Sequence, residues 1–159
     1  MKDVRPTSGK VLQALFNILG DVSGAKFLDL FAGTGRVGLE ALKRGADSCV
    51  FVENIKSRAE EIKKFSPESL ILSLEIHRAV TWLTKREMKF SIIFADPPYN
   101  AGWCGEILKI PFFEKLFDEK CIFVIEHSSR EEMNANENFK LISQRGYGET
   151  CLSFLEKII

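Results

Sequence analysis

Four consecutive residues, Asp96-Pro97-Pro98-Tyr99, follow the apolar run 90–95 and carry groups that could do chemistry. Because proline has a fixed φ and no N–H, the turn is stiff, and the Asp96 carboxylate and the Pro97 carbonyl remain as acceptors. Tyr99 offers a flat ring for stacking on a base. Such acceptors can hold both hydrogens of an exocyclic amine and orient its lone pair, in a reaction that needs positioning more than a strong base. We therefore predict that Asp96, Pro97 and Tyr99 are the catalytic residues of a base-modifying site.

Three glycines, Gly33, Gly35 and Gly38, follow the apolar run 26–30 and satisfy the G-x-G-x-x-G spacing between a strand and a helix. Glycine suits this turn because the backbone must bend tightly and approach a ligand closely, where a Cβ would interfere. Glu53 ends the next apolar run, where an acid commonly accepts hydrogen bonds from ribose hydroxyls. This pattern fits S-adenosylmethionine, but it also fits a dinucleotide, and hence a nicotinamide-dependent oxidoreductase.

Asp29 favours S-adenosylmethionine over a dinucleotide. It comes directly before the glycine-rich turn, where a carboxylate would repel a pyrophosphate and attract the ammonium of the methionine part. The sulfonium of this cofactor is a good leaving group, which suits a weakly nucleophilic amine. The cofactor-binding residues that we predict are Asp29, Phe31, Gly33, Gly35, Glu53 and Asp96.

Strand-like and helix-like segments alternate along most of the chain, which predicts an α/β fold with a mostly parallel sheet and helices on both faces. The polar stretch 128–138 is expected to be a mobile loop. Two segments near the end flank Arg145-Gly146-Tyr147-Gly148 and predict an antiparallel hairpin. The predicted strands are 26–30, 48–52, 70–76, 90–95, 121–126, 139–144 and 150–155, and the predicted helices are 8–19, 37–44, 56–65, 79–85 and 107–117.

The length of 159 residues suits one domain, so we expect residues 1–159 to form a single methyltransferase domain in which residues 1–24 lead into the sheet. Lys plus Arg and Asp plus Glu number 22 each, so no overall basic field attracts nucleic acid. A nucleic-acid partner would need a local basic surface near the active edge. The residues that we expect to form it are Lys2, Arg5, Lys10 and Arg36.

The four cysteines show no C-x-x-C pairing, and the two histidines match no ligand spacing. We therefore predict no metal site and a reducing, cytoplasmic environment. No apolar run approaches the roughly 20 residues that span a bilayer, so we expect no membrane association.

Several stretches of the chain resemble bacterial methyltransferases that modify guanine N2 in small-subunit ribosomal RNA, the RsmD family. The resemblance implies a Rossmann-like class I methyltransferase fold with an antiparallel C-terminal strand, S-adenosylmethionine as cofactor, and a substrate within an assembling small ribosomal subunit. We expect the protein to act as a monomer. The matching stretches are 5–8, 14–19, 29–35, 38–42, 96–99, 126–128 and 147–150.

The resemblance also implies roles for single residues. Asp29, Gly33 and Gly35 would cradle the methionine end, and Glu53 the ribose. Asp96 and Pro97 would bind the target amine and Tyr99 would stack on the guanine, while RNA would contact Arg5, Lys10, Arg36 and Tyr99.

The chain departs from the family at two places. Only four residues precede Arg5, where members usually carry a short basic hairpin. His77-Arg78-Ala79 stands where members usually carry an Asp or Asn that reaches the adenine amine, and arginine cannot accept a hydrogen bond. Two alternatives therefore stay open: an adenine-N6 methyltransferase on DNA or RNA, and a non-catalytic RNA-binding module on the same fold.

Overall fold

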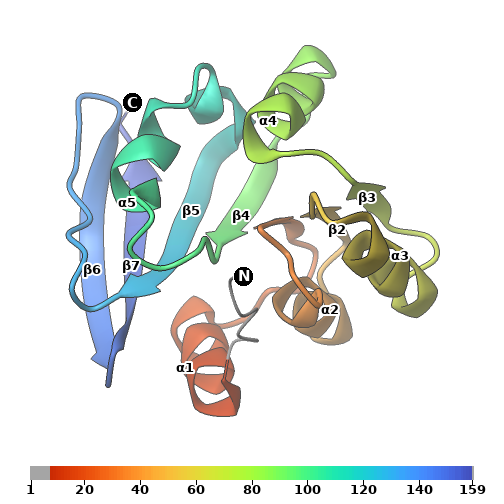
Figure 1. Ribbon diagram of the computed structural model, residues 1–159, viewed down its shortest axis with the longest axis horizontal. Helices are drawn as coiled ribbons and strands as arrows, with labels where there is room; N and C mark the ends of the chain where they lie inside the picture. Colours follow the sequence, from red (N-terminus) through yellow and green to blue (C-terminus); the bar gives the residue numbers. More distant parts are fainter. Residues whose placement is uncertain (1–7, 159) are drawn as a thin grey trace.

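The computed structural model describes residues 8–158, which form a seven-stranded sheet of order β3-β2-β1-β4-β5-β7-β6 (Figure 1). Strands β1 to β5 run parallel to one another, and β7 is antiparallel to both β5 and β6. This topology confirms the predicted mostly parallel sheet with an antiparallel C-terminal strand. The strands are β1 Lys26–Leu30, β2 Ser48–Val52, β3 Leu70–Leu72, β4 Phe90–Ala95, β5 Phe117–Ser128, β6 Phe139–Tyr147 and β7 Thr150–Lys157.

Helices cover both faces of the sheet, as predicted. Helices α1 to α3 pack on the face that carries Phe27, Phe51 and Phe94. Helix α4, helix α5 and two 3-10 turns pack on the opposite face, around Leu28 and Phe123. No helix in the described part of the chain is long and apolar enough to cross a membrane. The helical segments are α1 Gly9–Leu19, α2 Arg36–Lys43, α3 Lys56–Phe65, α4 Ile76–Lys85, α5 Trp103–Glu106, η1 Ile107–Lys109 and η2 Phe113–Leu116.

Strands β1, β2 and β4 end at the same level, which β5 passes at Ile125 before its own end at Ser128. Leu30 of β1 is in register with Val52 of β2 and Ala95 of β4, and Ala95 is in register with Ile125 of β5. The strand order reverses between β1 and β4, and ligands of open α/β sheets bind at such a switch point. The residues that follow this row therefore face one shared region.

Several predicted segments are wrong in their boundaries. The predicted strands 121–126, 139–144 and 150–155 are longer in the structure, as β5, β6 and β7. The predicted strand 70–76 ends at Leu72, and α4 begins at Ile76, three residues before the predicted start. The reason is a cap: the Glu75 carboxylate accepts hydrogen bonds from the backbone N–H groups of His77 (3.2 Å) and Arg78 (2.7 Å).

The predicted helix 107–117 is also wrong. The chain there forms the short helix α5 and two 3-10 turns, and β5 already begins at Phe117. Pro111 lies between the two turns, and the preceding Ile110 is extended, with ψ at 124°. A proline disfavours the helical region for the residue before it, so a continuous helix cannot form.

Candidate functional site

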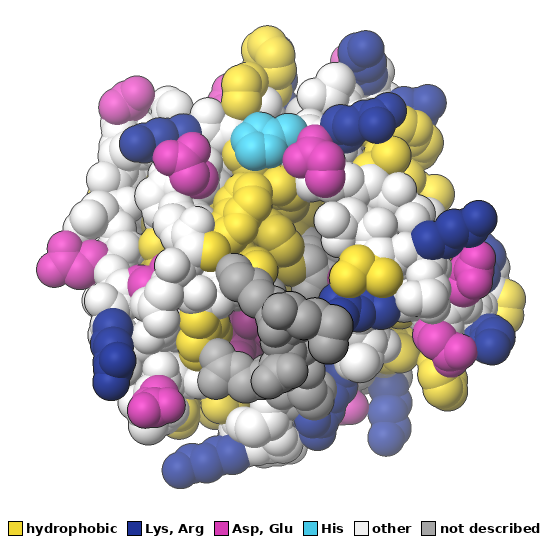
Figure 2. Space-filling model, in the orientation of Figure 1, with side chains coloured by type: hydrophobic (Ala, Val, Ile, Leu, Met, Phe, Trp, Pro, Cys, Tyr) yellow, Lys and Arg dark blue, Asp and Glu magenta, His cyan; other side chains and the backbone are white. Residues whose placement is uncertain are grey.

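A cavity of about 900 Å³ lies at the carboxyl ends of the parallel strands. In Figure 2, hydrophobic side chains gather in the middle of the molecule, where β4 ends in Figure 1. The volume is in the range of small-molecule sites. The predicted site residues that line this cavity are Asp29, Phe31, Gly33, Arg36, Glu53, Asp96, Pro97 and Tyr99.

The glycine-rich turn has two structural tasks. Gly33, which lines the cavity, and Gly35 have positive φ values of 59° and 79°, which glycine adopts readily. A Cβ on Gly35 would lie 2.9 Å from the Ile62 side chain of α3. A Cβ on Gly38 would lie 2.5 Å from the Phe51 ring. Gly33 thus shapes the cavity wall, whereas Gly35 and Gly38 allow close packing of the neighbouring elements.

Glu53 connects the two loops at one side of the cavity. Its side chain is buried, and its two carboxylate oxygens accept hydrogen bonds from the backbone N–H groups of Gly33 and Ile55, each at 2.8 Å. A carboxylate has about four lone-pair sites, so it can accept a ribose hydroxyl beside these two bonds. Glu53 is therefore suited both to fixing the loops and to binding a ribose.

Asp29 is almost completely buried. Its side chain is 1% exposed, and Oδ2 accepts a hydrogen bond of 3.0 Å from the backbone N–H of Gly38. Burial raises the pKa of Asp29 to about 8; the Gly38 hydrogen bond opposes this shift and the nearby Glu53 charge adds to it. Near neutral pH the carboxyl is therefore largely protonated, and a cationic ligand would favour its charged form.

Asp96 and Glu126 lie at the same level on adjacent strands, because Asp96 follows Ala95 and Glu126 follows Ile125. Both acids line the cavity. A role was predicted for Asp96 but none for Glu126, although Glu126 ends an apolar run just as Glu53 does. The sequence pattern that indicated Glu53 therefore indicated Glu126 as well.

The Tyr99 ring is anchored through its hydroxyl. That hydroxyl donates to Glu126 Oε2 at 3.2 Å and lies 2.8 Å from Thr150 Oγ1 at the start of β7. The C-terminal hairpin therefore helps to hold a predicted catalytic residue. Thr150 belongs to a stretch that resembles the RsmD family, but the sequence alone assigned it no contact.

Glu75 and Trp103 are among the cavity residues that the sequence analysis missed. Glu75, the N-cap of α4, lines the cavity and is an acceptor close to the position where the sequence showed only His77-Arg78-Ala79. Trp103 of α5 also lines the cavity, and its ring centroid lies 5.0 Å from that of Phe31 in an edge-on contact. Because the start of α4 was predicted too late, the capping position of Glu75 went unrecognised.

The family model described as "Conserved hypothetical protein 95" matches residues 1–156. The chain belongs to this family. YlbH of Bacillus subtilis (strain 168) is 30% identical over 161 residues, which cover 96% of this chain and 88% of YlbH. "Ribosomal RNA small subunit methyltransferase D" of Buchnera aphidicola subsp. Acyrthosiphon pisum (strain APS) is 30% identical over 147 residues, covering 90% and 77% of the two chains. These relatives confirm the resemblance to the RsmD family.

Solved structures confirm the class I methyltransferase fold. The yhhF protein of Escherichia coli superposes with a TM-score of 0.80 at 23% identity, covering 97% of this chain and 88% of its own. Ribosomal protein L11 methylase of Lactobacillus delbrueckii subsp. bulgaricus gives a TM-score of 0.72 at 13% identity, covering 98% and 90%. SMU.776, a structure complexed with SAH (S-adenosylhomocysteine), gives 0.70 at 14% identity, covering 94% of this chain and 48% of its own.

Of the basic residues predicted to bind RNA, only some lie at the cavity. Arg36 is exposed and lines it, whereas Lys10 is exposed on α1 and is not among the lining residues. The starts of the two helices adjoin, since Arg36 Nη2 lies 3.6 Å from the position of a Cβ on Gly9. Lys2 and Arg5 lie outside the described residues.

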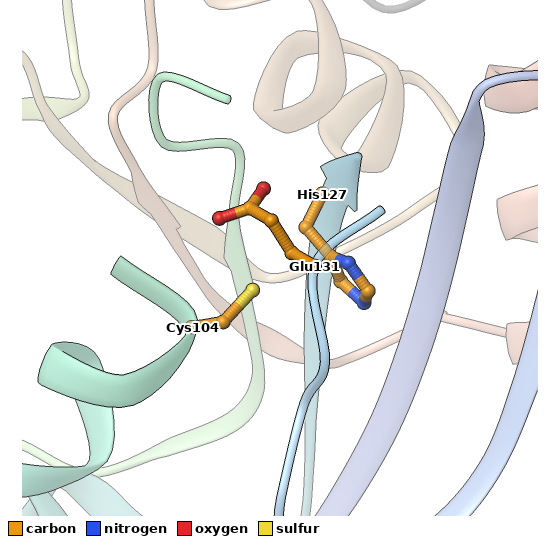
Figure 3. A group of neighbouring side chains, drawn as sticks. All are labelled: Cys104, His127 and Glu131. Atoms are coloured by element: carbon orange, nitrogen blue, oxygen red, sulfur yellow. The ribbon is translucent and has the colours of Figure 1, made fainter. Parts of the chain in front are cut away.

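Cys104, His127 and Glu131 form a cluster of potential metal ligands whose ligand atoms lie within 4.8 Å of one another. They come from α5, from β5 and from the segment after β5 (Figure 3). His127 Nδ1 lies 2.8 Å from the Ser128 carbonyl, and Nε2 lies 2.7 Å from Ser153 Oγ, so both ring nitrogens have protein partners. Burial raises the pKa of Cys104 to about 12, which keeps the thiol protonated. These features fit a hydrogen-bonded packing cluster better than a metal site.

Proposed function

We propose that this chain is an S-adenosylmethionine-dependent methyltransferase that acts on the N2 amine of a guanine in small-subunit ribosomal RNA. The observation that carries the proposal is that one cavity contains both the residues suited to the cofactor and the residues suited to the amine. Asp29, Gly33 and Glu53 lie on its cofactor side, and Asp96 and Pro97 supply acceptors for an amine. The relatives in the family that are named as ribosomal RNA methyltransferases support ribosomal RNA as the substrate.

The residues present fit S-adenosylmethionine. Asp29 offers a buried carboxyl for the ammonium, and Glu53 offers a carboxylate for the ribose hydroxyls. Ile55 and Ile76 line the cavity with apolar surface suited to an adenine ring, and Glu75 adds an acceptor beside it. When bound, the cofactor supplies an electrophilic methyl group on a sulfonium.

The Asp96 carboxylate and the Pro97 carbonyl would hold the two amine hydrogens and orient the nitrogen lone pair towards the methyl group. The new N–C bond would form as the methyl–sulfur bond breaks, which would leave a neutral thioether. Positive charge would develop on the amine nitrogen and be stabilised by the fixed Asp96 carboxylate, until the nitrogen loses one hydrogen as a proton to solvent. Tyr99 would stack on the base. We also propose that residues 1–159 act as one domain and as a monomer, on an assembling small subunit.

Incubation with radiolabelled S-adenosylmethionine tests this function directly. Undermethylated small ribosomal subunits and protein-free ribosomal RNA should be offered separately, and the RNA then digested to nucleosides. We expect the label in N2-methylguanosine, with the subunit as the better substrate. Label in N6-methyladenosine would instead support the adenine alternative, and absence of transfer to both substrates would support a non-catalytic module.

Replacing Glu53 with alanine should weaken cofactor binding by about 1–3 kcal/mol, the scale of hydrogen bonds to a charged group. The variant loses the acceptor for the ribose and the two bonds that fix the adjoining loops. Isothermal calorimetry measures the change. Glu60→Ala, at an exposed position of α3, is the matched control and should bind the cofactor normally. Unchanged affinity in Glu53→Ala would remove this residue from the site.

Cofactor affinity should rise with pH between about pH 6 and 7.5 because of Asp29. The free protein holds a proton on this carboxyl up to its raised pKa of about 8. The cofactor ammonium favours the charged carboxylate, so binding releases a proton, and affinity gains up to about tenfold per pH unit below that pKa. Calorimetry in buffers of different ionisation enthalpy counts the released protons. Asp29→Asn should abolish the release, and a wild-type protein that releases none would contradict this role.

Reversing the charges of Lys10 and Arg36 to glutamate should weaken RNA binding and flatten its salt dependence. Each lost phosphate contact lowers the slope of log affinity against log salt concentration by about one. Binding titrations of ribosomal RNA between low and moderate salt measure the slope. Reversal of Lys85 and Arg86, at the far end of α4, is the control. An unaltered slope in the Lys10 and Arg36 variant would place the RNA on another surface.

A further inference from the structure

The cavity contains a second acid beside Asp96 that methyl transfer to an amine does not itself require. Glu126 lies near the end of β5, its side chain is 6% exposed, and it lines the same cavity. Since Ala95 and Ile125 are in register, the acid that follows each of them leaves its strand at the same level. The substrate end of the cavity therefore presents two adjacent carboxyl groups.

The Glu126 carboxylate is held by a hydrogen bond from Tyr99 and by the paired strand that carries it. Its Oε2 accepts the Tyr99 hydroxyl at 3.2 Å, and Thr150 lies 2.8 Å from that hydroxyl. The next residue, His127, is 1% exposed, and Ser153 of β7 binds its ring at 2.7 Å. Strand β5 pairs with β7 through Glu126 and through the residues before and after it. A carboxylate fixed in this way is suited to reading a substrate group, because little reorganisation is needed on binding.

The bases differ in whether a ring nitrogen next to the amine-bearing carbon carries a hydrogen. In guanine, N1 carries a hydrogen next to the N2 amine, whereas in adenine and cytosine the ring nitrogen beside the amine is an acceptor. An ionised carboxylate only accepts hydrogen bonds, and its roughly four lone-pair sites allow it to bind a tyrosine hydroxyl and a base at once. Two adjacent acids therefore match a base edge that presents donors side by side.

We propose that Glu126 accepts the N1–H of the target guanine and thereby selects guanine over bases whose ring nitrogen is an acceptor. This inference rests on the proposed function, because it needs a guanine N2 amine at Asp96. Glu126 would then be a specificity-determining residue that touches the substrate base. Adenine would place its N1 lone pair against the carboxylate and be rejected.

The test compares two RNA substrates that share the 2-amino group but differ at N1, which carries a hydrogen only in guanine, and at C6, where an amine replaces the carbonyl oxygen. The target guanine, located first with the wild-type protein, is exchanged for 2,6-diaminopurine by ligation of a synthetic fragment. This base keeps the 2-amino group but has an acceptor at N1. Sites that hydrogen-bond a substrate group reject analogues that lack it by large factors, so we expect kcat/KM of the wild type to favour guanine by roughly 10²-fold or more.

Glu126→Gln should reduce this preference to about tenfold or less, because its amide can accept from guanine or donate to diaminopurine. Glu126→Ala should lower the guanine rate and leave the diaminopurine rate unchanged or raised. Glu156→Gln, at a half-buried position near the end of β7 where Glu156 pairs with Lys140, is the control and should keep the wild-type ratio. Thermal melts and cofactor titrations show that each variant is folded and loaded.

Tyr99→Phe separates base reading from anchoring of the tyrosine. If Glu126 served only to hold the Tyr99 hydroxyl, its variants would slow both substrates equally, as Tyr99→Phe would, and the ratio would stay at the wild-type value. That result overturns the inference while leaving guanine N2 methylation intact. A wild-type protein that never labels N2 overturns the proposed function and this inference together.

Discussion

Replacing Asp96 with alanine is expected to lower the single-turnover rate of methyl transfer by roughly 10²–10³-fold, the usual loss for one preorganised polar group. Asp96 follows Ala95, the last residue of β4, which is paired with β1 on one side and β5 on the other. Pro97 is buried behind it, so the turn has little freedom. Because the acceptors are already fixed, the carboxylate stabilises the developing charge without first having to reorganise.

Cofactor affinity should change far less than the rate in Asp96→Ala, because the ammonium and ribose contacts lie at Asp29 and Glu53. Asp47→Ala, at an exposed position between α2 and β2, is the matched control and should methylate normally. Thermal melts separate catalysis from folding: if Asp96 merely stabilised its turn, the melting temperature and the rate would fall together. A folded, cofactor-binding Asp96→Ala variant with the normal rate would contradict the mechanism.

The parts of the fold that local sequence determines could be predicted with little error. Strands β1, β2 and β4 have the predicted ends, because each is an apolar run bounded by polar or turn-forming residues. The start of α1 also depends on local sequence, because the hydroxyl of the capping Ser8 accepts the Val11 N–H at 3.2 Å. In these segments, propensity and tertiary packing favour the same structure.

The remaining parts depend on contacts between distant residues. The Tyr99 hydroxyl meets Glu126 and Thr150, which are 27 and 51 positions away along the chain, only after β4, β5 and β7 have paired. The raised pKa of Asp29 follows from complete burial, which a residue type and its neighbours in sequence do not reveal. The two sequence motifs thus sufficed to predict where the cavity lies. The residues at its substrate end could be identified only from the register of the paired strands.

Replacing Phe123 with alanine is expected to destabilise the fold by about 3–5 kcal/mol, the range for removing a fully buried aromatic side chain. Phe123 is completely buried in β5, and its ring centroid lies 5.3 Å from that of Phe113 and 6.1 Å from that of Phe117. Phe139 of β6 completes this aromatic cluster, 5.1 Å from Phe117. The cluster joins β5, the C-terminal hairpin and the 3-10 turn η2. The space left by the missing Phe123 ring therefore removes packing contacts between these elements.

Urea denaturation measures this loss as a lower midpoint at an unchanged slope. The matched control is Phe65→Ala at the end of α3, where the side chain is 72% exposed and the change should stay within about 0.5 kcal/mol. Equal midpoints for the two variants would mean that the aromatic cluster does not stabilise the fold. Because Phe123 lies three residues before Glu126 in the same strand, a folded Phe123→Ala variant should also show a weaker preference for guanine over diaminopurine, as the support of β5 loosens.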